Sequence, residues 1–186
     1  MPSYPSHLIQ RVTLADGTPV TIRPIRPGDA GLVRDFFGRL SDESRYNRFM
    51  DTLRELTPRM VSHFTEVDHD SHLALIAVSE TGGKETEIAV ARYVVSADRL
   101  ACEFAIVVGD EWQRKGLGKR LMQALIAAAR AAGVRLMHGD VLATNARMLR
   151  FVTPLGFSAR RDAADPRVMR VELRLDSASE AARSAN

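Results

Sequence analysis

The chain has 186 residues, of which 45% are hydrophobic and 26% are charged. These values are typical of a folded globular domain and exclude a disordered, collagen-like or wholly coiled-coil chain. The single cysteine, Cys102, excludes an internal disulfide and a cysteine-based zinc cluster. No apolar run approaches the roughly 20 residues of a membrane span, and residues 1–11 lack the apolar core of a secretory signal. We therefore expect a cytoplasmic protein with one domain over residues 8–176, a polar tail over 177–186 and no membrane partner.

The charge balance is nearly even, with 26 Lys and Arg against 23 Asp and Glu, a net charge of +3. The pI of about 9.4 is in the range of nucleic-acid-binding domains. The position of the cations argues against that interpretation, because four of them crowd one short segment without interleaved aromatic residues. These four are Arg114, Lys115, Lys119 and Arg120. Such clustering favours a single phosphate-bearing ligand over a nucleic acid.

Hydrophobic periodicity and turn residues predict a mixed α/β (α+β) domain. The predicted strands cover residues 8–14, 20–23, 72–79, 88–95, 101–108, 136–142 and 168–175, and the three from 72 to 108 have the spacing of an antiparallel meander. Predicted helices cover residues 32–40, a piece ending at Met50, a segment beginning at Pro58, residues 116–132 and residues 146–153. Asp29 and Thr57 are expected to cap the first and third of these helices.

The helix predicted over 116–132 begins against the usual rules. The positive end of a helix dipole disfavours cations, yet the four cations named above flank this helix start. Gly116 and Gly118 each weaken a helix by about 1 kcal/mol. Both features make sense if the turn binds an anion, because glycines let the backbone approach and free N–H groups point outward. The alternative is an exposed basic helix start; the strand before the turn and the strong helix after it favour a pyrophosphate site.

Residues 113–118, with the sequence Gln-Arg-Lys-Gly-Leu-Gly, resemble the acetyl-CoA signature of the GNAT superfamily of N-acetyltransferases, Gln/Arg-x-x-Gly-x-Gly/Ala. Residues 144–145 and 156–157 resemble a later segment of that family. More narrowly, residues 21–29 and 40–46 resemble the acetyltransferase domain of bacterial Pat-type protein lysine acetyltransferases. The resemblance covers nearly the whole chain. It implies a mostly antiparallel central sheet flanked by helices on both faces, acetyl-CoA as co-substrate and no metal.

The resemblance also implies which residues bind acetyl-CoA. The segment 113–118, which we call the glycine loop, would hold the pyrophosphate through backbone N–H groups, and the end of the preceding strand would lie along the pantetheine arm. That arrangement requires a splayed or bulged sheet. The implied contacts are Ile106, Val107, Val108, Gln113, Arg114, Lys115, Gly116, Leu117, Gly118, Lys119 and Asn145.

Glu103 is an ionisable residue inside the predicted strand 101–108. Glutamate is rarely buried without a partner, and apolar neighbours would desolvate its carboxylate and favour proton uptake. Such a group suits the general base that takes a proton from an acceptor amine. The Pat-type resemblance implies the same role for Glu103. The alternative is a glutamate paired with an arginine such as Arg92.

Other candidate residues are weaker. Strand alternation places Cys102 on the face opposite Glu103, which favours a buried structural thiol over a nucleophile. Many GNAT enzymes use a tyrosine as general acid where this chain has Val152, so water or another group would supply that proton. His69 and His72 lie in a polar turn without metal-ligand spacing. The remaining candidates are Arg45, Tyr46 and Arg48 near an acceptor groove and Trp112 as a packing residue.

The sequence therefore predicts an acetyl-CoA-dependent N-acetyltransferase that acts as a monomer or homodimer. The favoured acceptor is a protein lysine, and the resemblance implies an acyl-CoA synthetase as the first protein to consider. Two alternatives stay open. The acceptor could be a small amine such as an antibiotic, polyamine or amino acid, or the chain could be a non-catalytic acyl-CoA-sensing module.

Overall fold

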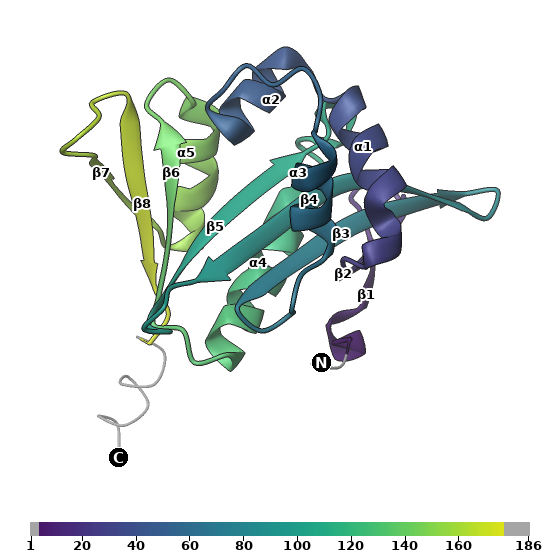
Figure 1. The fold of residues 1–186 in the computed structure, drawn as a ribbon, viewed down its shortest axis with the longest axis horizontal. Helices are drawn as coiled ribbons and strands as arrows, with labels where there is room; N and C mark the ends of the chain where they lie inside the picture. The colour runs from purple at the N-terminus through teal and green to yellow at the C-terminus, as the bar shows by residue number, and fades with distance from the viewer. Residues whose placement is uncertain (1–3, 177–186) are drawn as a thin grey trace.

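The computed structural model describes residues 4–176, so the tail predicted over 177–186 lies outside the described residues. Eight strands form one sheet in the order β1-β2-β3-β4-β5-β6-β8-β7 (Figure 1). The strands are β1 (Gln10–Thr13), β2 (Pro19–Pro24), β3 (His72–Thr81), β4 (Lys84–Val95), β5 (Ala101–Val108), β6 (Leu136–Leu142), β7 (Ser158–Arg161) and β8 (Val168–Arg174). Neighbouring strands are antiparallel except β5 and β6, which are parallel. The predicted mixed, mostly antiparallel sheet is confirmed.

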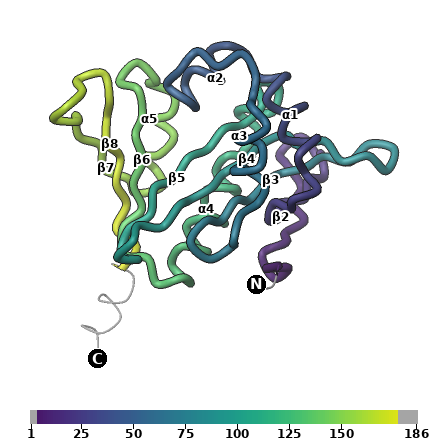
Figure 2. Tube along the Cα trace, viewed as in Figure 1, coloured from purple at the N-terminus to yellow at the C-terminus, as the bar shows by residue number. Residues whose placement is uncertain are grey.

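Helices cover both faces of this sheet (Figure 2). They are α1 (Ala30–Arg39), α2 (Asp42–Phe49), α3 (Pro58–Thr65), α4 (Leu117–Ala131) and α5 (Ala146–Val152), with short 3-10 turns η1 (Ser6–Leu8), η2 (Pro27–Asp29), η3 (Asp110–Trp112) and η4 (Thr153–Leu155). One apolar core joins α4 and α5 to the back of the sheet, and a smaller core joins α1 and α3 to the front. The apolar stripe of α4 explains its place, because Leu117, Leu121 and Leu125 are fully buried.

Three local predictions are wrong. Residues 6–8 form a 3-10 turn, so the first strand begins only at Gln10. Strand β7 was not predicted, because all of its side chains are exposed and it has no apolar alternation. Asp29 does not cap α1; its carboxylate accepts hydrogen bonds from the guanidinium of Arg23 at 2.8 and 2.9 Å and from the backbone N–H of Arg26 at 2.7 Å. The predicted cap by Thr57 is confirmed, since its hydroxyl accepts from the N–H of Met60 at 3.3 Å.

The parallel pair β5 and β6 separates part of the way along. The two strands pair only from Ala101 opposite Leu136 to Glu103 opposite His138, whereas β6 stays paired with β8 through Leu142. The ring of Phe104 fills the back of the gap, 5.1 Å from the ring centre of Phe157. A Cβ atom at Gly139 would lie 2.8 Å from Cε1 of Phe104, so only glycine fits there without movement. The sheet is therefore splayed at the point that the resemblance required.

Candidate active site

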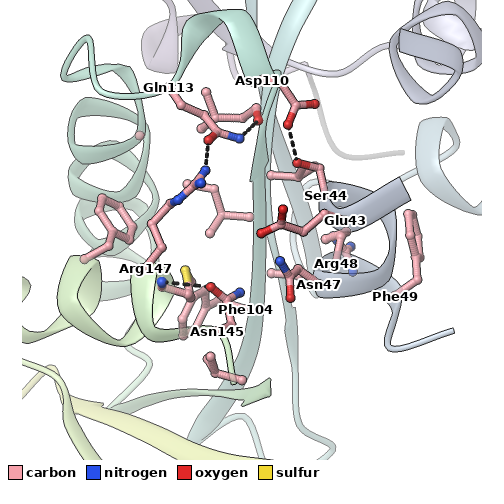
Figure 3. A pocket seen from close by; sticks show the side chains of 18 of the residues that line it. Glu43, Ser44, Asn47, Arg48, Phe49, Phe104, Asp110, Gln113, Asn145 and Arg147 are labelled. Atoms are coloured by element: carbon pink, nitrogen blue, oxygen red, sulfur yellow. Dashed lines mark hydrogen bonds between the residues drawn. The ribbon is translucent and has the colours of Figure 1, made fainter. Parts of the chain in front are cut away.

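A cavity of about 640 Å³ opens where β5 and β6 separate. Its walls come from α2, the outer part of β5, the glycine loop, the first turn of α4, the end of β6, and α5 (Figure 3). Because β5 has no partner strand here on one side, its backbone polar groups beyond Glu103 are accessible along that edge. An extended ligand with amide groups can therefore lie along β5 as an additional strand would.

The glycine loop supplies an anion site at one end of the cavity. Arg114 and Gly116 have φ angles of +62° and +83°, and left-handed backbone in a non-glycine residue such as Arg114 is costly and typical of functional turns. No side chain among the described residues caps the first turn of α4. Its N–H groups are therefore available to an anion. The side chains of Arg114, Lys119 and Arg147 add positive charge around the opening.

All the predicted acetyl-CoA contacts line this cavity except Lys115 and Leu117. The ammonium of Lys115 points away, 3.1 Å from a carboxylate oxygen of Asp16 and 5.0 Å from the ring centre of Trp112. The side chain of Leu117 is fully buried, so only its backbone can reach a ligand. Sequence reasoning missed Arg147, because its place beside the glycine loop depends on how α5 packs.

Two predicted contact residues also hold the cavity wall together. The Gln113 amide donates to the carbonyl of Val108 at 3.1 Å, and its oxygen accepts a hydrogen bond from Arg147 (Figure 3). The Asn145 side-chain oxygen accepts from the N–H of Met148 at 3.0 Å and so caps α5. Both amide oxygens are therefore engaged within the protein, and the Asn145 NH₂ group is the part of that side chain that can donate to a ligand.

Glu103 lines the cavity at the last residue pair before the strands separate. The expectation of a desolvated carboxylate is wrong, because Glu103 is exposed on the front of the sheet, at the mouth of the splay. The alternative ion pair with Arg92 is not found in residues 4–176; the guanidinium of Arg92 lies 4.5 Å from the ring centre of Phe64. Cys102 is fully buried on the opposite face, as predicted, and burial raises its pKa to about 12.

Helix α2 forms the wall across the cavity from the glycine loop. Its first turn is fixed by Asp110, whose carboxylate accepts from the N–H and hydroxyl of Ser41, both at 2.9 Å, and from the hydroxyl of Ser44 at 2.7 Å. Of the three α2 candidates, only Arg48 lines the cavity. Burial lowers the pKa of Arg48 to about 10, while the Glu103 carboxylate acts in the opposite direction. Arg45 instead donates to backbone carbonyls of α1 at 3.2 and 3.0 Å.

A second cavity of about 30 Å³ lies behind this wall and contains an acid that sequence reasoning missed. Glu87 is 1% exposed, and its Oε2 atom has no hydrogen-bond partner among the described residues. Burial raises the pKa of Glu87 to about 8, against the opposing effect of Arg92. Arg48 lines both cavities, so this buried carboxyl group lies close behind the wall of the main site.

A splayed, mostly antiparallel sheet with an uncapped, cation-rich glycine loop beside the opening defines a class of acyl-CoA-dependent acyltransferases. The chain matches the Acetyltransferase (GNAT) family over residues 34–157 and belongs to it. Members of this family use acetyl-CoA, and the cations and accessible β5 edge described above fit that co-substrate. No helix within residues 4–176 has the length and apolar character needed to cross a membrane.

Particular relatives are similar over most of the chain. Acetyltransferase PA5475 of Pseudomonas aeruginosa is 33% identical over 153 residues, or 82% of each protein. Acetyltransferase Pat of Mycolicibacterium smegmatis is 33% identical over 136 residues, which cover 73% of this chain and 40% of Pat. The crystal structure of the GNAT domain of S. lividans PAT superposes with a TM-score of 0.84 at 30% identity, covering 92% of this chain and 99% of that domain.

Proposed function

We propose that residues 8–176 form one acetyltransferase domain that transfers the acetyl group of acetyl-CoA to a lysine amine of a protein, with Glu103 as general base. The observation that carries this proposal is that Glu103 and the glycine loop line the same cavity, Glu103 where β5 and β6 part and the loop beyond the far end of β5. The glycine loop would hold the pyrophosphate, and the accessible edge of β5 would hold the pantetheine arm. The thioester would then lie near the place where the strands part.

The proposed reaction is direct transfer within a ternary complex. Glu103 accepts a proton from the acceptor ammonium, either directly or through a water molecule, which frees the nitrogen lone pair. The nitrogen attacks the thioester carbonyl, the new C–N bond forms, the C–S bond breaks, and the nitrogen releases its second proton to solvent to leave a neutral amide. A backbone N–H near Val107 would stabilise the oxyanion. Val152 is buried and carries no proton donor, so the leaving thiolate takes its proton from solvent.

The lysine acceptor is supported by the likeness to Pat and to the GNAT domain of S. lividans PAT. An acyl-CoA synthetase is accordingly the first protein acceptor to test. Thiol release from acetyl-CoA, measured against a panel of proteins and small amines, separates the two acceptor classes. If small amines are turned over and mass spectrometry detects no protein acetylation, the acceptor is a small amine and the proposed protein lysine is refuted.

Two variants test the site directly. Glu103→Gln is expected to bind acetyl-CoA normally in calorimetry and to lose kcat by roughly 10²- to 10⁴-fold, because the proton acceptor is removed. Gly118→Glu is expected to abolish acetyl-CoA binding, since it adds bulk and negative charge where an added Cβ would already lie 3.5 Å from Phe151 and Val108. Normal turnover in the first variant, or normal affinity in the second, would refute the corresponding assignment.

A further inference from the structure

The charged side chains that line the main cavity are segregated by sign. Three cations surround the glycine loop: Arg114, Lys119 and Arg147. Carboxylates line the side formed by α2, β5 and β6: Glu43, Glu103 and Asp140, with Arg48 as the cation on that side. A fourth lining carboxylate, Asp110, follows β5 in η3 and is hydrogen-bonded to Ser41 and Ser44 at the start of α2. A cavity with this division attracts phosphates at one end and a positively charged group at the other.

The carboxylates that line the cavity differ in whether they already have an ion-pair or hydrogen-bond partner within the protein. Asp140 pairs with Arg170 at 2.6 Å, and Asp110 accepts the serine hydrogen bonds of α2 described above. Glu43 and Glu103 have no ion pair or hydrogen bond to a side chain within residues 4–176. Glu43 is therefore left to interact with a group that enters from the acceptor side, and so is Glu103, whose carboxylate also acts electrostatically on Arg48 of the same wall.

The position of Glu43 is set by its helix. It lies in the first turn of α2, and its carboxylate points into the cavity beside Asn47 (Figure 3). The turn that carries it is anchored through Ser41 and Ser44, so little reorganisation is needed to keep its charge there. Asp42, the preceding residue of the same turn, does not line the cavity and lies 3.8 Å from Arg45.

We propose that Glu43 determines acceptor specificity by binding the acceptor ammonium from the side of α2 before Glu103 removes its proton. This inference rests on the proposed function. A lysine amine, with an ordinary pKa of about 10.4, reaches the site as a cation. Its attraction to Glu43 is made before the chemical step, so it contributes to the KM for the acceptor and little to kcat. Glu43 thereby favours cationic amines over neutral ones.

The test compares Glu43→Gln with the wild-type protein, using a peptide with one lysine flanked by glycines. The KM for this peptide is expected to rise about fivefold, the effect of a partly exposed ion pair, while kcat and the KM for acetyl-CoA stay within about twofold. The wild-type KM is expected to increase with salt more steeply than that of the variant, because screening weakens the same attraction. Asp42→Asn is the matched control, since it removes an equal charge from the same turn outside the cavity and should leave the KM unchanged.

The outcomes separate this inference from the proposed function. An unchanged KM and salt dependence in Glu43→Gln, with normal wild-type turnover, would overturn the role of Glu43 alone. An equal rise in KM for Asp42→Asn would show a general surface effect and would also overturn it. If the wild-type protein transfers no acetyl group, the role of Glu43 can still be tested by calorimetry, which measures binding of the peptide to the CoA-loaded protein. Weaker binding by Glu43→Gln supports the role of Glu43, and equal binding refutes it.

Discussion

Replacing Glu87 by glutamine is expected to change how the stability of this protein depends on pH. The Glu87 carboxyl group is 1% exposed, and one of its oxygens has no hydrogen-bond partner among the described residues. Burial disfavours the charged form, and the pKa of Glu87 rises from 4.5 to about 8. Glutamine keeps nearly the same shape but cannot ionise.

The sign and size of the effect follow from this difference. Between pH 4.5 and 8 the folded protein holds a proton on Glu87 that the unfolded chain has released. The free energy of unfolding therefore falls as the pH rises through this window, by at most about 1.4 kcal/mol per pH unit and about 5 kcal/mol in all. Glu87→Gln removes this contribution. The two proteins should be similarly stable at pH 5, and the variant should be more stable by a few kcal/mol at pH 8.

Urea unfolding followed by circular dichroism from pH 5 to 8 measures this difference. A thermal scan should show a melting temperature up to about 10 °C higher for the variant at pH 8, given 2–4 °C per kcal/mol for a chain of this size. Glu80→Gln is the control, because Glu80 is exposed at the end of β3 and should leave the pH dependence unchanged. Parallel pH profiles for the wild-type protein and Glu87→Gln would refute the argument that burial holds Glu87 protonated.

Two further substitutions test contacts around the site, and a third tests a buried ion pair between β2 and η2. Gly139→Ala places a methyl group 2.8 Å from the Phe104 ring and should lower the free energy of unfolding in urea by about 1–3 kcal/mol. Phe104→Leu in the same background should restore part of the lost stability, and an unchanged stability of Gly139→Ala would contradict the close contact. Asp110→Ala should raise the KM for the acceptor more than that for acetyl-CoA, because it releases the first turn of α2; equal effects on both would argue against this anchoring role. Arg23→Met leaves Asp29 buried without its bidentate partner and should cost about 3–5 kcal/mol, whereas a loss below 1 kcal/mol would show that Asp29 is solvated.

Much of this arrangement could be predicted because it depends on local sequence. Alternation and helical spacing predicted the central strands and α4, whose buried leucines recur at helical intervals. The glycine loop was found because its cations and glycines contradict the rules for a helix start, and a functional site explains that contradiction. Strand β7 escaped prediction since none of its side chains is buried, so its pairing with β8 leaves no hydrophobic pattern.

The environments of the two important glutamates could not be predicted from local patterns. Glu103 is exposed at the last pair before β5 and β6 separate, and the next residue, Phe104, closely approaches Gly139, 35 positions along the chain. Glu87 lies in a polar run, residues 84–87, that resembles part of the preceding turn. The structure continues β4 through this run, and the β3–β4 register shifts between Ala77 and Val78, where Glu87 pairs with Val78. Burial at such a position depends on the fold rather than on neighbouring residues.

The segment between β5 and α4 connects the two halves of the site. Within four positions, Asp110 fixes α2 on the acceptor side, and Gln113 joins the end of β5 to Arg147 of α5 on the cation-rich side. A change in the backbone conformation of this segment would displace both walls together and should alter the KM values of both substrates, whereas Asp110→Ala releases the α2 wall alone. Glu43 contributes to one wall without these connections. A substitution there should affect the acceptor alone, and this difference is what makes acceptor choice adjustable without loss of acetyl-CoA binding.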